Sequence, residues 1–357
     1  MKQSERSYKR IVVKIGSSLF YSDKKKLDFS LLSNIVEEIS GLAKEGHEII
    51  VVSSGAIALG MSVLGLQDRP KELSYLQAIA AVGQNELMDK FREFFAKKEL
   101  NCAQVLLTWE DFDNRKRYLN AKNTLLTLLK LKAVPVINEN DTISTEEIKF
   151  GDNDRLSALV AAISGAGLLI ILSDVDGLLL KDKKTVVNIV DKITPEIKVL
   201  ARPTERKTSV GGMITKIEAA KIAVDSGIPC FITNGRHKAA VSSALKTPVG
   251  NGTLFLPKKG VLPAKDRWIA FGSKPKGCIS VDDGAKKALL NKKSLLSVGV
   301  LALSGTFECG DVISITDKAG SEFARGKVCI CCKDLDKVKG RRSEKEVVHC
   351  DNIVILG

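Results

Sequence analysis

Two acid-amide clusters contain the side chains of this chain that are best suited to binding chemistry. Residues 138–141 read Asn-Glu-Asn-Asp directly after an apolar run, and residues 151–154 read Gly-Asp-Asn-Asp. Asn and Asp side chains can accept from an ammonium group, donate to a carboxylate and hold a metal-bound phosphate. Either cluster alone is also typical of a turn. Together they indicate a site for a small zwitterionic ligand.

Lys14 lies at the end of the first predicted strand, next to Gly16. In open α/β sheets, ligands bind at the carboxyl ends of the strands. Lysine supplies a compact positive charge, and glycine lets the backbone approach a phosphate closely. We interpret Lys14 as a phosphate contact, the alternative being a solvated surface charge.

A second turn of small residues, residues 53–60, follows another predicted strand and opens into a helix. It contains Ser54 and Gly55. Free N–H groups at a helix start bind a carboxylate or a phosphate. The same small residues would also suit tight packing between a helix and a strand.

Two later segments are interpreted as nucleotide contacts. Ser173 and Asp174 end a predicted strand, and residues 209–216 place glycines just before a helix with Lys216 in its first turn. Neither segment matches G-x-x-x-x-G-K-[ST], and no G-x-G-x-x-G follows the first strand. A nucleotide would therefore bind in neither the P-loop nor the Rossmann manner.

The types of residue missing from these segments favour one reaction class. The three histidines, His47, His237 and His349, lie outside the clusters, and no cysteine lies in them. A substrate carboxylate that attacks the terminal phosphate of ATP needs no proton removed, only orientation and neutralised charge. Lysines that reach the phosphoryl group, with a carboxylate that fixes them, would suffice.

Short β-branched runs alternate with amphipathic helical patterns up to Leu256. This alternation predicts an α/β domain with a mainly parallel sheet sandwiched by helices. The predicted strands are 10–15, 48–53, 103–107, 134–138, 168–173 and 229–233, and the predicted helices are 29–44, 73–95, 121–131, 154–162 and 215–226.

The chain changes character after residue 257. We expect the catalytic domain at 1–257, a charged linker at 258–266 and a small, mainly β domain at 267–357. The runs 268–271, 277–281, 299–302, 312–316, 323–332 and 347–354 are predicted strands, and 283–290 is a predicted helix.

Composition narrows the class of protein. The 357 residues are 44% hydrophobic, which suits two domains with large cores, and no apolar run approaches a membrane span. The spacing of the eight cysteines favours reduced thiols, several on strands, over zinc or disulfides, and we expect a cytoplasmic protein. The net charge of +13 is denser in the tail, where a solvated surface is favoured over RNA binding.

Over nearly its whole length the chain resembles the glutamate 5-kinases of the amino acid kinase family, with a C-terminal PUA domain. The segments that carry the resemblance are V-V-K-I-G-S-S, S-S-G-A-I-A-L-G, L-N-A-K-N-T-L, V-P-V-I-N-E-N-D, K-F-G-D-N-D-R-L-S-A, S-D-V-D-G-L and G-G-M-I-T-K-I-E-A-A, and in the tail W-I and G-T-F-E-C-G-D-V-I.

The resemblance implies ATP-dependent phosphorylation of the side-chain carboxylate of L-glutamate to L-glutamyl 5-phosphate, the first step of proline biosynthesis. It implies that Lys14 and Lys216 hold the phosphates and that Asp154 orients both lysines. The implied glutamate-binding residues are Ser54, Gly55, Asn138, Asp141 and Asn153. The implied nucleotide-binding residues are Lys14, Ser173, Asp174, Val210, Gly211, Gly212, Met213, Ile214, Thr215 and Lys216.

The resemblance further implies Mg²⁺ with ATP but no protein ligand to it, proline as feedback inhibitor, a homo-oligomer and transient contact with glutamyl phosphate reductase. Val210 and Ser173 depart from the family's usual glycine-rich loop and threonine, which bears on the affinity for ATP. The alternatives are a kinase of the same family acting on aspartate, acetylglutamate or a nucleoside monophosphate, or an RNA-binding protein acting through the PUA domain.

Overall fold

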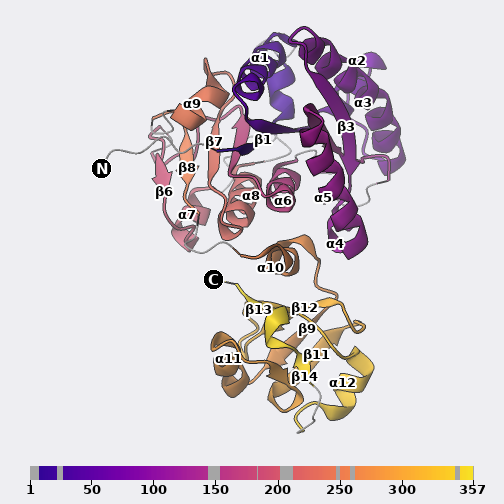
Figure 1. Ribbon diagram of the computed structural model, residues 1–357, viewed down its shortest axis with the longest axis vertical. Helices are drawn as coiled ribbons and strands as arrows, with labels where there is room; N and C mark the ends of the chain where they lie inside the picture. Colours follow the sequence, from indigo (N-terminus) through magenta and orange to yellow (C-terminus); the bar gives the residue numbers. More distant parts are fainter. Residues whose placement is uncertain are drawn as a thin grey trace. The chain divides into compact units, whose positions relative to one another are not determined.

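A computed structural model describes residues 8–21, 27–143, 153–182, 184–201, 212–246, 250–257, 262–341 and 346–356. The chain divides into two compact units (Figure 1). The first unit comprises residues 1–111 and 115–261, and the second comprises residues 112–114 and 262–357. The predicted α/β fold with a mainly β tail is confirmed.

The first unit is built on an eight-stranded sheet with the order β3-β4-β2-β1-β5-β7-β8-β6. Neighbouring strands are parallel except β7 and β8, which are antiparallel. The strands are β1 (Arg10–Ile15), β2 (Glu48–Ser53), β3 (Asn101–Leu107), β4 (Ala133–Glu139), β5 (Leu168–Ser173), β6 (Ile189–Val190), β7 (Cys230–Asn234) and β8 (Thr253–Phe255).

Helices in two layers cover this sheet (Figure 1). α1 contacts α3 and α9, whereas α6 contacts α5 and α8. The helices are α1 (Ser30–Lys44), α2 (Ala56–Val63), α3 (Leu73–Ala96), α4 (Trp109–Asp113), α5 (Arg115–Lys130), α6 (Asp154–Ser164), α7 (Pro195–Leu200), α8 (Met213–Asp225) and α9 (Ala240–Lys246).

The alternation of side chains along β1 directs Lys14 toward one layer. Ile11, Val13 and Ile15 belong to the core cluster shared with α1, α3 and α9. Successive side chains of a strand point to opposite faces. Lys14 therefore faces the layer of α6 and α8, which carries the other catalytic candidates.

Helices α2 and α3 pack with their backbones in direct contact. A Cβ on Gly83 would lie 1.9 Å from the carbonyl oxygen of Ala56, and a Cβ on Gly60 would lie 1.9 Å from that of Ile79. Only glycine allows two helices to approach so closely. The contact holds α3 against the start of α2.

The second unit contains a five-stranded sheet with the order β11-β9-β12-β13-β15 and a two-stranded pair, β10 and β14. The strands are β9 (Gly277–Val281), β10 (Leu295–Leu296), β11 (Val300–Gly305), β12 (Val312–Thr316), β13 (Glu322–Lys327), β14 (Glu346–Val348) and β15 (Ile353–Ile355). Its helices are α10 (Ala264–Arg267), α11 (Asp283–Leu290) and α12 (Cys332–Val338). Phe307 and Leu335 lie in its buried core.

The structure corrects three predicted strands of the tail. The predicted strand 347–354 is two short strands, β14 and β15, separated by a helical turn at Cys350–Asn352. Trp268–Gly272 is a buried helical turn that continues α10, and the indole Nε1 of Trp268 donates to the carbonyl of Phe112 at 2.9 Å. The predicted strand 323–332 ends at Lys327, and α12 begins at Cys332. A short apolar run in the sequence does not distinguish a strand from a helix.

The prediction that several of the cysteines lie on strands is confirmed. Cys102, Cys230 and Cys278 lie on strands, whereas Cys329 and Cys331 do not.

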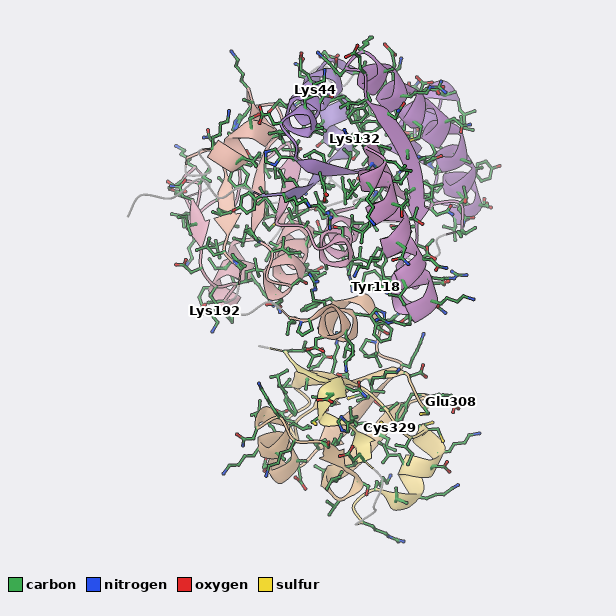
Figure 2. All side chains as sticks on the ribbon, in the orientation of Figure 1. Lys44, Tyr118, Lys132, Lys192, Glu308 and Cys329 are labelled. Carbon is green, nitrogen blue, oxygen red and sulfur yellow. The ribbon has the colours of Figure 1, made fainter. Side chains whose placement is uncertain are left out.

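No described helix combines the length and apolar character that a membrane span requires. Charged side chains such as those of Lys44 and Lys192 extend into solvent from the first unit, and Glu308 and Cys329 are exposed on the second (Figure 2).

Candidate active site

A single buried carboxylate lies between two buried amines at one edge of the large sheet. Asp154 Oδ1 lies 2.7 Å from Lys14 Nζ, and Asp154 Oδ2 lies 3.1 Å from Lys216 Nζ. Asp154 is fully buried, Lys14 is 1% exposed and Lys216 is 4% exposed. Two amines and one carboxylate leave an excess of positive charge, which suits an anionic ligand.

Three different elements position these groups. Lys14 comes from β1, Asp154 is the first residue of α6, and Lys216 lies in the first turn of α8. The hydroxyl of Thr215 also donates to Asp154 Oδ2 at 2.9 Å. A carboxylate at a helix N-terminus is further stabilised by the helix dipole. The two carboxylate oxygens of Asp154 therefore face two lysine amines and a hydroxyl.

A pocket opens beside this centre, with an empty volume of about 440 Å³ that includes its opening to solvent. Its lining comes from the ends of β1, β2 and β4 and from the starts of α2 and α6. The lining residues are Ser17, Ser54, Gly55, Ala56, Ile57, Ala58, Arg69, Asn138, Glu139, Asp141 and Asn153. Asn153 and Asp154 are consecutive, so the pocket adjoins the lysine centre.

The N-terminus of α2 faces the pocket with Ala56, Ile57 and Ala58. Gly55 caps this helix with φ +100°, and a Cβ there would lie 2.5 Å from the ring of Phe20. Glycine is therefore required on both counts. The first backbone N–H groups of a helix have no partner within the helix, which makes this wall suitable for a carboxylate.

Asp141 and Arg69 supply opposite charges to the same pocket. Burial raises the pKa of Asp141 to about 6, while the positive charge of Arg69 acts to lower it. The guanidinium of Arg69 is half-buried, and this desolvation lowers its own pKa. With Glu139, the pocket lining holds two carboxylates and one guanidinium, which can pair with the ammonium and carboxylate groups of an amino acid.

The predicted nucleotide contacts lie at the ends of β5 and α8. Ser173 is buried and donates its hydroxyl to Asp174, which is exposed. Gly16 N–H donates to the carbonyl of Leu172, so the ends of β1 and β5 are held together. Gly212, Met213, Ile214 and Thr215 form the start of α8, next to Lys216. Val210 and Gly211 lie outside the described residues.

The structure gathers Lys14, Asp154 and Lys216 in one centre and brings all five predicted glutamate-binding residues to one pocket. Their roles stay predictions. Sequence reasoning missed Arg69 and Ser17 in the pocket lining, and it gave no role to Glu139 of the first acid-amide cluster. Arg69 follows the end of α2 in a segment without a periodic pattern, so no signal pointed to it.

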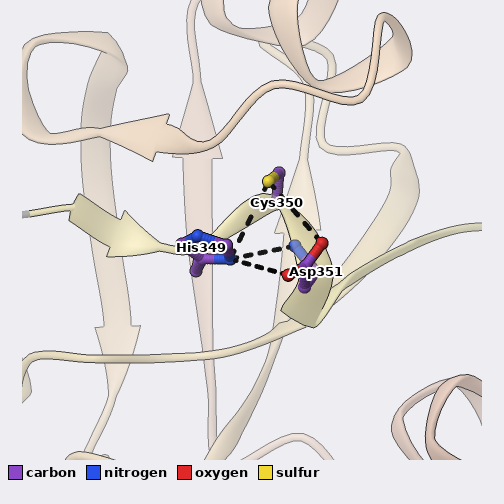
Figure 3. A group of neighbouring side chains, drawn as sticks. All are labelled: His349, Cys350 and Asp351. Carbon is purple, nitrogen blue, oxygen red and sulfur yellow. Dashed lines mark hydrogen bonds and ion pairs between the residues drawn. The ribbon is translucent and has the colours of Figure 1, made fainter.

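In the second unit, a separate group of possible metal ligands consists of His349, Cys350 and Asp351, whose ligand atoms lie within 4.8 Å of one another (Figure 3). The Nδ1 of His349 accepts from the backbone N–H of Asp351 at 3.2 Å. A metal on Nδ1 would have to displace this hydrogen bond. The three residues are consecutive and exposed or half-exposed.

A mainly parallel α/β sheet whose carboxyl edge holds paired lysines beside a polar pocket is typical of a class of phosphoryl-transfer enzymes. The sequence profile of the amino acid kinase family matches residues 9–234, and that of the PUA domain matches residues 277–350. The chain therefore belongs to the amino acid kinase family, and within it to the glutamate 5-kinases, which the curated relatives identify.

Proteins named glutamate 5-kinase resemble the chain along its length. That of Caldanaerobacter subterraneus is 42% identical over 97% of this chain and 98% of its own, and that of Pelagibacter ubique is 43% identical over the same shares. The solved N-acetylglutamate synthase of Neisseria gonorrhoeae, in complex with coenzyme A and N-acetyl-glutamate, shares the fold at 16% identity, with a TM-score of 0.51 over 71% of this chain and 60% of that chain.

Proposed function

We propose that this chain transfers the γ-phosphoryl group of ATP to the side-chain carboxylate of L-glutamate, giving L-glutamyl 5-phosphate and ADP in the first step of proline biosynthesis. The observation that carries the proposal is the adjacency of Asn153 and Asp154. Asn153 lines a pocket whose carboxylates and guanidinium can pair with an amino acid, and Asp154 holds the two lysines suited to a phosphoryl group.

The substrate binds through its α-amino acid head. Asp141 pairs with the α-ammonium group, while the amides at the start of α2 and the guanidinium of Arg69 offer partners for carboxylate oxygens. This arrangement leaves the side chain to extend toward Asp154 and the lysines. Orientation of the two reactants in this way removes much of the entropic barrier.

In the transfer step, an oxygen of the glutamate side-chain carboxylate forms a bond to the γ-phosphorus as the bond to the ADP oxygen breaks. No proton needs to be removed, because the nucleophile is already an anion. Lys14 and Lys216 reduce the repulsion between carboxylate and phosphate and stabilise the charge that moves to ADP. Asp154 fixes both amines at 2.7 and 3.1 Å.

Ser173, Asp174 and the segment from Val210 to Lys216 hold the nucleotide in this proposal. Mg²⁺ accompanies ATP mainly through phosphate oxygens and water, since Asp154 is already engaged by Lys14 and Lys216. Bound in this way, the ion neutralises phosphate charge. The protein's own contribution is the pair of lysines.

Regulation and assembly belong to the same proposal. Proline shares the α-amino acid head of glutamate, so it competes at the pocket of Asp141 and Arg69. The enzyme works in the cytoplasm as a homo-oligomer and passes its unstable acyl phosphate to glutamyl phosphate reductase through transient contact. The catalytic domain spans residues 1–257, and the PUA domain spans residues 267–357.

A hydroxylamine trap tests the reaction, because hydroxylamine converts an acyl phosphate into a stable hydroxamate. The protein is incubated with ATP, Mg²⁺ and L-glutamate, L-aspartate, N-acetyl-L-glutamate or a nucleoside monophosphate. We expect hydroxamate with L-glutamate and ADP release that depends on it. Preference for another acceptor would overturn the proposal. A salt-dependent RNA shift without acyl phosphate would instead favour the RNA-binding alternative.

A further inference from the structure

A chain of hydrogen bonds leads from helix α3 into the glutamate pocket. Asn138 Nδ2 donates to Gln84 Oε1 at 2.7 Å, and Asn153 Nδ2 donates to Asn138 Oδ1 at 2.5 Å. Asn138 is 2% exposed and Asn153 is 6% exposed, whereas Gln84 is half-buried behind them. Gln84 is not among the residues that line the pocket.

The direction of each bond determines what the pocket wall offers a ligand. Asn153 Nδ2 donates to the carbonyl of Ser53 as well as to Asn138 Oδ1. Both hydrogens of its amide are therefore engaged, and Oδ1 is the atom that can meet a donor in the pocket. The wall at Asn153 is an acceptor, which suits an ammonium group and repels a carboxylate.

Asn138 keeps the side-chain amide of Asn153 in this orientation only while its own side-chain amide stays in place. Its Oδ1 accepts from the backbone N–H of Glu139 at 3.0 Å and from Asn153, and its Nδ2 donates to Gln84. Without Gln84, a buried N–H would lose its acceptor, which is costly inside a protein. The Asn138 side chain would then turn to find another acceptor and release Asn153.

The contact between α2 and α3 explains why Gln84 can reach Asn138. Gly83, the preceding residue, lies against α2, where a Cβ would be 2.3 Å from the N atom of Gly60 and 1.9 Å from the carbonyl oxygen of Ala56. This close approach brings Gln84 of α3 within hydrogen-bond distance of β4. Gly83 thus allows the close helix contact, and Gln84 supplies the acceptor that this contact places beside Asn138.

We propose that Gln84 is a positioning residue that fixes the amides of Asn138 and Asn153, so that the pocket accepts a hydrogen bond from the substrate's α-ammonium group. It acts through Asn138 without touching the substrate. The proposal rests on the proposed glutamate kinase activity and adds a determinant of selectivity for α-amino acids over dicarboxylates without an amine.

The test compares Gln84→Met, which keeps the length of the side chain but removes the acceptor, with Gln84→Glu, which restores an acceptor in the same place. Gln104→Met on the exposed position of edge strand β3 is the matched control. KM and kcat are measured with glutamate, with glutarate, which lacks the amine, and with ATP. Glutamate binding is followed by calorimetry, and thermal melting checks the fold.

We expect Q84M to raise the KM for glutamate about tenfold or more, as the loss of one buried hydrogen bond would. The KM for ATP should change less than twofold, the preference for glutamate over glutarate should narrow, and Q84E should recover most of the affinity. An unchanged KM and glutarate ratio in Q84M would overturn the proposal, as would equal losses in Q84M and Q84E. An inactive parent that also fails to bind glutamate would instead overturn the proposed function.

Discussion

Asn153 and Asp154 are neighbours in the chain, yet their side chains serve two different parts of the site. Asn153 lines the pocket and donates to Asn138 and Ser53, whereas Asp154 pairs with Lys14 and Lys216. In the proposed reaction, the start of α6 therefore joins amino acid recognition to phosphoryl transfer. Changes on the two sides should have separable effects on binding and turnover.

Replacing Asp154 by Asn should lower turnover by at least about 10²-fold, because the lysines would lose the group that orients them. It should also lower the free energy of unfolding by about 3 kcal/mol or more, since two buried amines would lose their counter-charge. Urea denaturation and hydroxamate kinetics measure the two effects. Asp89→Asn, in an exposed ion pair with Arg92, is the control and should change neither. A fully active D154N enzyme would contradict this role.

Replacing Lys14 or Lys216 by Ala should reduce kcat far more than it weakens glutamate binding. Each amine acts mainly on charge that develops in the transition state. Asp141→Asn should do the opposite, raising the KM for glutamate more than it lowers kcat. Steady-state kinetics with both substrates distinguish these patterns. Equal losses in glutamate affinity and kcat for the lysine variants would refute the assignment.

Glutamate binding should weaken as the pH falls through about 6, where Asp141 becomes protonated. The ionised carboxylate pairs with the α-ammonium group, so affinity is kept above this pKa and lost below it. Burial makes the folded state bind this proton more readily than the unfolded chain, so the contribution of Asp141 to stability falls as the pH rises through the same window. Calorimetric titration of glutamate from pH 5 to pH 8 measures the affinity.

In Arg69→Gln, the loss of glutamate affinity at low pH should begin at a higher pH, because the positive charge of Arg69 acts to lower the pKa of Asp141. The same titration on the variant measures the shift. Asp141→Asn should flatten the pH dependence between pH 5 and pH 7. If glutamate affinity fell at the same pH in R69Q as in the parent protein, the guanidinium would not act on Asp141.

Gly83→Ala should destabilise the first unit by about 3 kcal/mol, because its methyl group would collide with the backbone of α2. Gly41→Ala is the matched control. Gly41 lies within α1 with no atom near its missing Cβ, so the change should stabilise the protein by about 0.5 kcal/mol. Urea unfolding of both variants gives the free energies. Similar changes in the free energy of unfolding for G83A and G41A would show that α2 and α3 are not in close contact at Gly83.

The sequence predicted most of the sheet because its central strands are continuous buried runs. The bounds of β1, β2 and β5 match the prediction residue for residue, and Lys14 was correctly assigned to a strand end. The antiparallel pair of β7 and β8 was missed, since β8 is only three residues long. In the tail, Trp268–Phe271 has a strand-like composition but is helical, because tertiary contacts such as the indole bond to Phe112 decide its conformation.

The candidate site was predictable where motifs end strands or begin helices, and unpredictable where tertiary packing brings a side chain into place. Lys14, Asp154 and Lys216 come from such motifs. Arg69 and Gln84 do not, because one lies in a loop and the other on a helix whose approach depends on glycines. Their positions follow only from the folded backbone.

The central claim, that the side-chain carboxylate of glutamate attacks ATP, can be tested by following oxygen. Glutamate labelled with ¹⁸O in that carboxylate is incubated with the enzyme, ATP and hydroxylamine, which attacks the acyl carbon and releases phosphate with the bridging oxygen. The ³¹P signal of this phosphate reports the label. We predict one ¹⁸O atom in each phosphate released. Unlabelled phosphate would mean that water attacks ATP instead, and it would contradict the account.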